Sequence, residues 1–304
     1  MDPNGRKRRK RGQSVHGWVV LDKPLGMGST KAVSNVRRLM DAQKAGHAGT
    51  LDPLATGVLP IALGEATKTV PFLMDAAKAY DFGIAFGTST DTLDAEGGVT
   101  GRSDARPTDM ALRSVLSRFI GAVKQVPPKY SAIKIDGKRA YDLARSGADI
   151  AMKTRIVRID DVRLNTFDGE VATLSVECGK GTYVRSLARD ICEALGVEGH
   201  VSMLRRTRVG PFDLQRSLTV DRLQALCDSA AASEALLPLS TALDDIPVLA
   251  VGDHEAADLK QGKAIGLPPN SPHAETVLVE CGGIPVCLGQ PRDGRILPKR
   301  VFNI

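Results

Sequence analysis

Residues 46–60 read Gly46-His47-Ala48-Gly49-Thr50-Leu51-Asp52-Pro53-Leu54-Ala55-Thr56-Gly57-Val58-Leu59-Pro60 and constrain the segments around them. Pro53 disfavours a helical backbone at Asp52, and the three glycines permit turns that other residues resist, so a shaped loop is predicted. The apolar run from Val58 to Leu63 predicts a buried strand that anchors this loop. A rigidly held loop suits a reactive carboxylate, but aspartate before proline is also ordinary turn chemistry. The loop alone leaves both interpretations open.

Length and charge narrow the class of protein. A chain of 304 residues can bury a full hydrophobic core, as one large domain or as a large and a small one. Hydrophobic residues make up 42% and charged residues 25%, which is typical of globular proteins. The net charge of +6 favours a polyanionic partner, and nucleic acid is the commonest such partner for a basic protein.

The cysteines and the N-terminus indicate a cytoplasmic protein without membrane segments. The five cysteines show no CxxC spacing, which argues against a disulfide framework and a zinc site. No run approaches the roughly 20 apolar residues that span a bilayer, and the N-terminus lacks the apolar core of a signal peptide. Residues 1–15 contain the run Arg6–Arg11, which predicts a disordered basic tail. This tail is either a solvated segment without specific use or an arm that seeks RNA phosphates.

The first third of the chain supplies two further candidate residues. A short strand over 16–21 leads to a glycine-rich turn that contains Lys23, and a helix capped by Ser29 or Thr30 follows. The glycine spacing in this turn does not extend to a nucleotide-binding fingerprint. A half-buried strand over 79–87 places Tyr80 on its apolar face. Residues 88–101 are predicted to be a loop, whose acidic residues lack the spacing of a calcium loop.

The middle of the chain predicts a basic hairpin. A helix over 108–121, capped by Thr108, precedes a strand and an Asp136-Gly137 turn within residues 125–139. The basic residues on this segment are Lys129, Lys134, Lys138 and Arg139. They form either a solvated charge cluster or, as the overall charge favours, a contact with the RNA backbone.

Two strands, over 155–165 and 170–177, precede a helix that begins at Thr182 and stops at Gly196. Tyr183 and Arg185 are expected in its first turn, where the positive helix end draws anions. A guanidinium there suits either a carboxylate from another loop or a phosphate. A strand over 201–210 and a helix over 219–230 come next. From Val248 onward, short apolar runs broken by Gly and Pro predict a small β-barrel of about sixty residues.

Six blocks of the sequence together resemble the bacterial TruB family, the tRNA pseudouridine-55 synthases. These blocks are Leu21-Asp22-Lys23-Pro24, the segment from Gly46 to Gly57, Ala79-Tyr80, Tyr130-Ser131-Ala132-Ile133-Lys134, Gly179-Lys180-Gly181-Thr182-Tyr183-Val184-Arg185 and Leu204-Arg205-Arg206. Their order and spacing match the family from about Gly17 to the C-terminus. The final segment is similar to a PUA-type RNA-binding domain.

The resemblance implies a fold and a domain organisation. The fold class is α+β: a mixed, largely antiparallel sheet with flanking helices, the pseudouridine synthase fold, plus a small C-terminal PUA-like β-barrel. The implied division is a basic tail over 1–15, a catalytic domain over 16–246 and a PUA-like domain over 247–304. We expect a cytoplasmic monomer that binds the T-arm of tRNA.

The resemblance also implies an activity, the isomerisation of one T-loop uridine to pseudouridine without metal or organic cofactor. The implied roles are Asp52 as catalytic carboxylate, Tyr80 stacking on the extracted base, Arg185 pairing with Asp52, Tyr183 and Leu204 lining the pocket, His47 entering the space that the base leaves, and Lys23 and Pro24 supporting the floor. Extracting a base costs a few kcal/mol, offset by aromatic stacking and backbone contacts. Attack on C1′, attack on C6 and removal of a ribose proton all remain open for Asp52.

Two rival functions belong to other classes. One is a non-catalytic protein that binds or folds RNA, and Asp52 argues against it. The other is a guide-RNA-dependent synthase of the related archaeal and eukaryotic branch, which requires partner proteins. The resemblance to the stand-alone bacterial branch favours an enzyme that works alone.

Overall fold

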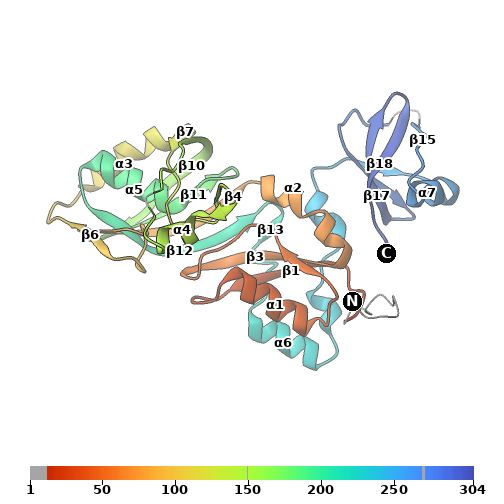
Figure 1. The fold of residues 1–304 in the computed structure, drawn as a ribbon, viewed down its shortest axis with the longest axis horizontal. Helices are drawn as coiled ribbons and strands as arrows, with labels where there is room; N and C mark the ends of the chain where they lie inside the picture. The colour runs from red at the N-terminus through yellow and green to blue at the C-terminus, as the bar shows by residue number, and fades with distance from the viewer. Residues whose placement is uncertain (1–11, 149, 269–270) are drawn as a thin grey trace.

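The computed structural model describes residues 12–148, 150–268 and 271–304. The basic run Arg6–Arg11 lies outside these residues. A nine-stranded sheet forms the larger part of the molecule, and a five-stranded sheet forms the C-terminal part (Figure 1).

The larger sheet is mixed and largely antiparallel, as predicted. Its strands in spatial order are β1 (Gly17–Lys23), β3 (Ala55–Leu63), β12 (Gly199–Val209), β4 (Lys78–Phe86), β11 (Val171–Cys178), β10 (Arg155–Phe167) and β7 (Gly121–Gln125), with β2 (Ala45–His47) beside β3 and β13 (Phe212–Asp213) beside β12. Among the described strands of this sheet, β3 and β12 form its one parallel pair. In β4, Phe82, Ile84 and Phe86 are buried on one face, because alternate residues of a strand point the same way.

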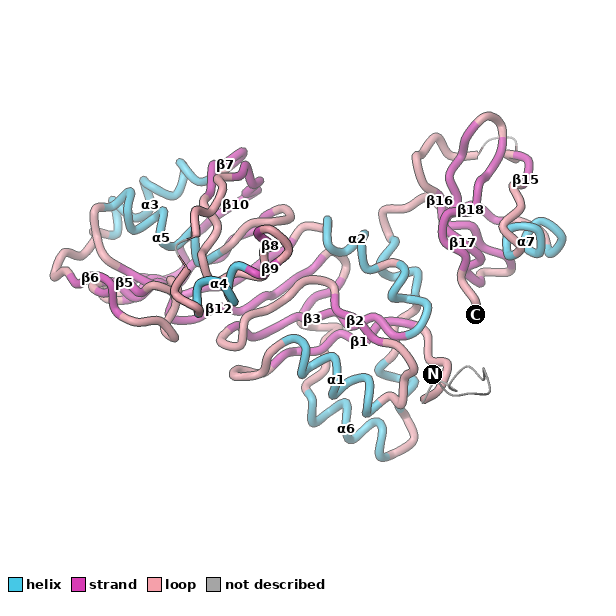
Figure 2. Tube along the Cα trace, viewed as in Figure 1, coloured by secondary structure: helices cyan, strands magenta, loops and turns pink. Residues whose placement is uncertain are grey.

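Helices cover both halves of this sheet (Figure 2). Helices α3 (Asp109–Leu116) and α5 (Val184–Leu195) share a core with β4, β10 and β11, whereas α1 (Ser29–Leu39) and α6 (Val220–Asp228) share a core with β1 and β3. The other short helices are α2 (Val70–Asp75), α4 (Ala140–Arg145) and the 3-10 helices η1 (Gly64–Lys68), η2 (Ser117–Phe119), η3 (Ala232–Ala235) and η4 (Leu239–Leu243). Thr108, the predicted cap of α3, and Thr219, where the helix over 219–230 is predicted to begin, each accept a hydrogen bond from the first turn of their helix.

One edge of strand β3 pairs first with β12 and then with β2, and the Asp52 loop lies where this partner changes. On one side, β3 pairs with β12 at residues 55–57 and with β2 at residues 61–63, so Pro60 lies between the two pairings. A proline has no N–H to donate and is tolerated where the ladder is interrupted. Its carbonyl accepts from Ala48 N at 3.0 Å. The loop that carries Asp52 therefore leaves the sheet at a gap between two anchored ends.

The C-terminal sheet has β14 and β15 as its two edge strands, and among the described strands these two do not pair with each other. Its strands in spatial order are β14 (Val248–Ala250), β16 (Val277–Cys281), β17 (Ile284–Arg292), β18 (Arg295–Val301) and β15 (Ile265–Gly266), and α7 (Asp253–Lys260) packs on it. Phe302 belongs to the same core as Trp18 of β1. Lys68 Nζ donates to Val301 O at 2.6 Å, and Asn303 N donates to Glu65 Oε2 at 2.9 Å. The C-terminal part is therefore packed against η1.

Two local expectations are wrong because of long-range contacts. The N-cap of α1 is Gly28, not Ser29 or Thr30, since the Ser29 hydroxyl bonds to the backbone of Leu51 instead. Helix α5 begins at Val184 with Tyr183 as its N-cap. Tyr183 keeps an extended backbone, and its N–H donates to the Gln125 side chain at 2.8 Å.

Two segments expected to lack regular structure contain some. Strands β5 (Thr88–Thr90) and β6 (Val99–Arg102) form a small hairpin inside the segment predicted to be a loop. Residues 12–15 belonged to the predicted tail, yet Gln13 N donates to Asp41 O at 2.6 Å and Gln43 Nε2 donates to Gly12 O at 3.0 Å. Hydrogen bonds with Asp41 and Gln43, which follow α1, hold this stretch in place.

Candidate active site

The loop between β2 and β3 presents Asp52 at the middle of the sheet. The Ser29 hydroxyl donates to Leu51 O and accepts from Leu51 N, both at 2.8 Å. Gly26 N donates to Pro53 O at 2.9 Å. The residues on both sides of Asp52 are thus held by the turn and helix that follow β1. Its side chain is 41% exposed, so a substrate can reach the carboxylate.

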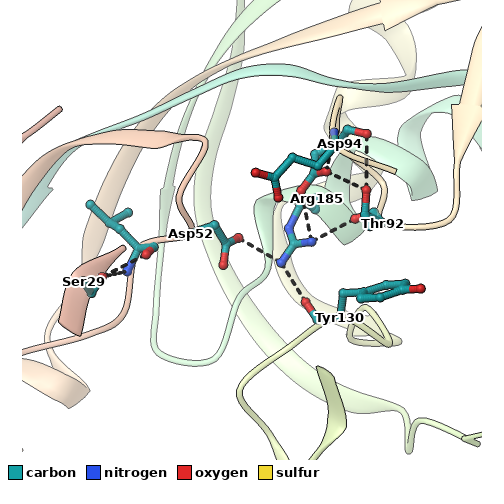
Figure 3. A network of polar contacts seen from close by, with 8 residues as sticks. Ser29, Asp52, Thr92, Asp94, Tyr130 and Arg185 are labelled. Carbon is teal, nitrogen blue, oxygen red and sulfur yellow. Dashed lines mark hydrogen bonds and ion pairs between the residues drawn. The ribbon is translucent and has the colours of Figure 1, made fainter. Parts of the chain in front are cut away.

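Arg185 joins three segments at one guanidinium (Figure 3). Its Nη2 lies 2.8 Å from Asp52 Oδ2 and donates to Tyr130 O at 2.9 Å. Its Nη1 lies 3.2 Å from Asp94 Oδ2 and donates to Thr92 O at 2.8 Å. The side chain is only 6% exposed. The contact with Asp52 that the family resemblance implies is present, and two further segments hold the guanidinium in place.

Asp94 is a site residue that the sequence did not identify. Its side chain is 8% exposed, and its Oδ1 accepts from Thr92 Oγ1 at 2.6 Å and from Glu96 N at 3.1 Å. Alternating hydroxyl and carboxylate residues such as Thr92 and Asp94 are a signal for turns closed by side chains. This local signal does not predict the contact between Asp94 and Arg185, because that contact depends on the tertiary fold.

A cleft opens at Asp52. It is lined by Asp52, Leu54, Ala55, Asp94, Arg185, Val201, Ser202, Met203 and Leu204. The β12–β4 ladder is irregular between Val201 and Met203, just before Leu204. Such irregularities commonly re-aim side chains beside active sites. Leu204 therefore supplies an apolar wall next to the carboxylate.

Two tyrosines lie near this cleft. Tyr80 and Leu204 both pack against the cores on the two halves of the sheet. Burial raises the pKa of both Tyr80 and Tyr183, and the Asp52 charge acts in the same direction. Both phenols therefore stay protonated and neutral near pH 7.

Lys23 contacts the Asp52 loop, and His47 precedes this loop on β2. The fully buried Lys23 Nζ donates to Pro24 O at 3.0 Å, to Met27 O at 2.6 Å and to Pro53 O at 3.4 Å, so it ties the β1–α1 turn to the loop. Burial lowers the pKa of Lys23 to about 8, although the Asp52 charge opposes this shift. Burial and the Arg206 charge lower the pKa of His47, which favours the neutral imidazole at pH 7.

The basic hairpin forms as predicted. Strands β8 (Lys134–Ile135) and β9 (Lys138–Arg139) flank the Asp136-Gly137 turn, and Lys129, Lys134, Lys138 and Arg139 are exposed. The guanidinium carbons of Arg139 and Arg145 lie 5.7 and 5.8 Å from the Tyr141 ring centre. The base of the hairpin supplies the Tyr130 carbonyl to Arg185. The hairpin is therefore connected directly to the guanidinium beside Asp52.

Metal ligands and membrane spans are two further features that bear on function. No group of three His, Cys, Asp or Glu side chains suitable for a metal ion occurs in the part of the chain that the structure describes. Every helix within residues 12–148, 150–268 and 271–304 is too short or too polar to cross a bilayer.

Sequence comparison gives matches over nearly the whole chain. The profile described as "TruB family pseudouridylate synthase (N terminal domain)" matches residues 37–184, and that described as "tRNA pseudouridylate synthase B C-terminal domain" matches residues 185–244. "tRNA pseudouridine synthase B" of Caulobacter sp. (strain K31) is 55% identical, over 98% of this chain and 99% of that protein. The protein of the same name from Rhodopseudomonas palustris is 53% identical, over 99% of this chain and 84% of that protein.

Solved structures give a similar fold. The "Crystal Structure of a Cbf5-Nop10-Gar1 Complex" contains a chain 26% identical to this one, with a TM-score of 0.73 over 94% of this chain and 84% of that chain. The "Structure of H/ACA RNP bound to a substrate RNA containing 2'-deoxyuridine" contains one that is 23% identical, with a TM-score of 0.74 over 100% of this chain and 93% of that chain. The second likeness supports the fold alone.

Proposed function

The chain belongs to the TruB family and is an enzyme that isomerises uridine in tRNA to pseudouridine, and from this premise we propose its target and its catalytic residues. The target is uridine 55 in the T-loop, and Asp52 is the catalytic carboxylate. The enzyme acts as a cytoplasmic monomer without metal, organic cofactor or guide RNA. The observation that carries the catalytic assignment is the contact of Asp52 with the buried Arg185 at the cleft.

The reaction exchanges one bond for another. The N1–C1′ glycosidic bond breaks and a C5–C1′ bond forms, while C5 loses a proton and N1 gains one, so the product is an isomer. A carboxylate is already ionised at pH 7 and needs no metal or neighbouring base to become reactive. Arg185 contacts Asp52 through Oδ2, which leaves Oδ1 available to the nucleoside. The partly exposed Asp52 carboxylate is thereby oriented by the Arg185 guanidinium, which is itself held by Asp94 and two backbone carbonyls.

The base must leave the T-loop stack to reach Asp52. We assign Tyr80 to stacking on the extracted base, with Tyr183 and Leu204 as walls of the pocket. Leu204 lines the same cleft as Asp52, which supports this assignment. His47, on β2 before the Asp52 loop, fills the space that the base leaves. Neutral aromatic and apolar contacts of this kind offset the few kcal/mol that unstacking costs.

The floor and the RNA surface complete the proposed site. Lys23 supports the floor by tying the Pro24 turn to Pro53. The exposed basic residues of the hairpin contact the tRNA backbone. Residues 16–246 form the catalytic domain, and residues 247–304 form a PUA-like RNA-binding domain.

The test of this function is direct. Purified protein is incubated with an unmodified tRNA transcript, without added RNA or protein, and pseudouridine is mapped by position. We expect conversion at uridine 55 and none in a transcript that carries cytidine there. Conversion at other uridines would overturn the T-loop assignment, and a requirement for a guide RNA would favour the guide-dependent alternative.

Replacing Asp52 tests the catalytic assignment in the same assay. Asp52→Asn should abolish conversion while tRNA affinity stays within about tenfold, because it removes a charge needed for chemistry and leaves the phosphate contacts. Pseudouridine formed by a clean Asp52→Asn preparation would exclude Asp52 as the catalytic group.

A further inference from the structure

Arg206 is a buried cation beside the proposed active site. The residue lies on β12 and is 1% exposed. Its guanidinium donates to backbone carbonyls, and no carboxylate of the described residues lies within ion-pair distance of it. Burying a charged group without an opposite charge carries a desolvation cost, and such groups cluster at functional sites.

The Arg206 guanidinium holds both ends of the Asp52 loop. Its Nη2 donates to Gly49 O at 3.1 Å, and its Nε donates to Val58 O at 2.8 Å. One carbonyl precedes Asp52 and the other follows it within the anchoring strand β3. A planar guanidinium fixes the relative position of two acceptors more rigidly than a flexible amine does.

Gly57 of β3 makes room for the Arg206 backbone, and Gly49 of the loop lies beside the Arg206 guanidinium. Gly49 has φ +93°, and a side chain there would bring Cβ to 3.4 Å from Arg206 Nη1. Gly57 has φ +99°, and its Cβ would lie only 2.1 Å from Arg206 O. Gly57 is also the residue that faces Arg206 in the parallel β3–β12 pair. The backbone of Arg206 therefore requires a glycine at position 57, and its side chain lies close against Gly49.

The same guanidinium reaches the tyrosine proposed to stack on the base. Tyr80 is the partner of Arg206 in the antiparallel β12–β4 register. Cross-strand partners present their side chains on the same face of a sheet, so the guanidinium and the phenol lie on one face. The nearby Arg206 charge opposes the rise in pKa that burial causes in Tyr80. Arg206 thus bonds to the loop that carries the carboxylate and faces Tyr80 on the neighbouring strand.

We propose that Arg206 is a positioning residue, whose guanidinium fixes the Asp52 loop relative to Tyr80 so that both meet the same nucleoside. This inference rests on the function proposed above. Small displacements of a reacting group can cost about 10²-fold in rate, so a defect in positioning lowers the chemical step more than tRNA binding.

The matched control for Arg206 is its neighbour on β12. Arg205 is also an arginine, but it is half-buried and pairs with Asp22 at 2.8 Å, away from Gly49 and Val58. The variants are Arg206→Lys, which keeps the charge and loses the planar fork, and Arg206→Met, which loses both. Arg205→Lys and Arg205→Met are made in parallel.

The first readout is the single-turnover rate at saturating tRNA together with the tRNA Kd. Arg206→Lys should slow the rate by about 10²-fold with Kd within about threefold, whereas Arg205→Lys should change the rate less than about threefold. A wild-type rate in Arg206→Lys would overturn the proposal. Equal losses in both arginine variants would also overturn it, because they would report a general effect on β12.

The second readout needs neither substrate nor turnover. The chain contains four tyrosines, so protein labelled with ¹³C at the tyrosine ζ carbon gives a simple NMR spectrum in which Tyr80→Phe assigns the Tyr80 signal. Arg206→Lys and Arg206→Met should shift this signal, and the Arg205 variants should leave it in place. An unmoved Tyr80 signal in the Arg206 variants would show that Arg206 does not influence Tyr80, and would overturn the proposal. If the proposed function is wrong, the wild-type protein will be inactive. The NMR comparison between the variants and the wild type can still be made, because it does not depend on activity. If Arg206→Met does not fold, Arg206→Lys decides both readouts.

Discussion

The guanidinium of Arg185 lies 2.8 Å from the carboxylate of Asp52, although Arg185 lies in the first turn of α5 and Asp52 lies in the loop before β3. The same guanidinium lies 3.2 Å from Asp94. One buried cation thus stands between two carboxylates that come from different loops. Contacts on both sides therefore hold the Arg185 guanidinium in place, and the guanidinium in turn orients the Asp52 carboxylate at the cleft.

Arg185→Lys should lower the single-turnover rate by about 10²-fold or more, with tRNA affinity nearly unchanged. Lysine keeps the positive charge but lacks the fork that reaches Asp52, Asp94 and two backbone carbonyls at once. Arg189→Lys is the control, because Arg189 lies on the same helix and pairs with Asp190 at 2.7 Å. A wild-type rate for Arg185→Lys would show that Arg185 does not orient Asp52.

Asp94→Asn should also slow the chemical step, by about tenfold, because the amide no longer balances the Arg185 charge. The asparagine keeps the size of the side chain and an oxygen for Thr92 Oγ1, which now donates to the carboxylate at 2.6 Å. The rate is compared with that of Asp190→Asn, an acidic residue on α5 away from the cleft. If both variants keep the wild-type rate, the Asp94 contact serves stability alone.

Local residue chemistry made much of the framework predictable. Pro53 and the glycines around Asp52 predict a loop wherever they occur, and Asp136-Gly137 predicts a hairpin turn. Thr108 and Thr219 bond to the first turns of their own helices, so the local sequence was sufficient to predict where each helix begins. The family and the reaction followed from the order of whole sequence blocks, which no single element could provide.

Contacts between distant segments were beyond that reasoning. Ser29 looks like a helix cap, yet its hydroxyl is taken by Leu51 from another segment. Arg206 looks like one more basic residue of a strand, and its burial depends on the parallel pairing that sets Gly57 against it. Asp94 resembles a loop carboxylate until α5 brings Arg185 beside it.

Removing charge from the hairpin should weaken tRNA binding without slowing chemistry at saturating tRNA. For the pair Lys134→Ala and Lys138→Ala, the slope of log affinity against log salt should fall by about 0.7 to 0.9 for each phosphate that the protein no longer neutralises. Both lysines are exposed. Arg113→Ala is the control, since Arg113 is an exposed residue of α3 that pairs with Asp109 at 2.7 Å. A salt slope unchanged from wild type would indicate that the hairpin lysines are solvated and contact no RNA.

The stability of the fold should rise with pH near pH 8, and Lys78 should account for part of that rise. Lys78 Nζ is buried and donates to Leu73 O at 3.2 Å, to Met74 O at 2.9 Å and to Ala76 O at 2.6 Å, where it caps α2. Burial lowers the pKa of Lys78 from 10.5 to about 8, and Lys23 has a pKa of about 8 for the same reason. Above pH 8 the unfolded chain therefore binds more protons at these amines than the folded chain does.

The sign of the effect follows from this difference in bound protons, because stability increases with pH wherever the unfolded state holds more of them. Buried thiols act in the opposite direction closer to pH 9, since burial raises the pKa of Cys178 to about 11. Chemical denaturation is therefore measured between about pH 7.5 and 8.5. Near pH 8.5, Lys78→Met should reduce the slope of unfolding free energy against pH by about 1 kcal/mol per pH unit relative to wild type, whatever its effect on absolute stability. The control is Lys124→Met, at an exposed lysine of β7, which should leave the slope unchanged. An equal slope in wild type and Lys78→Met would show that Lys78 titrates in the folded protein as it does in the unfolded chain.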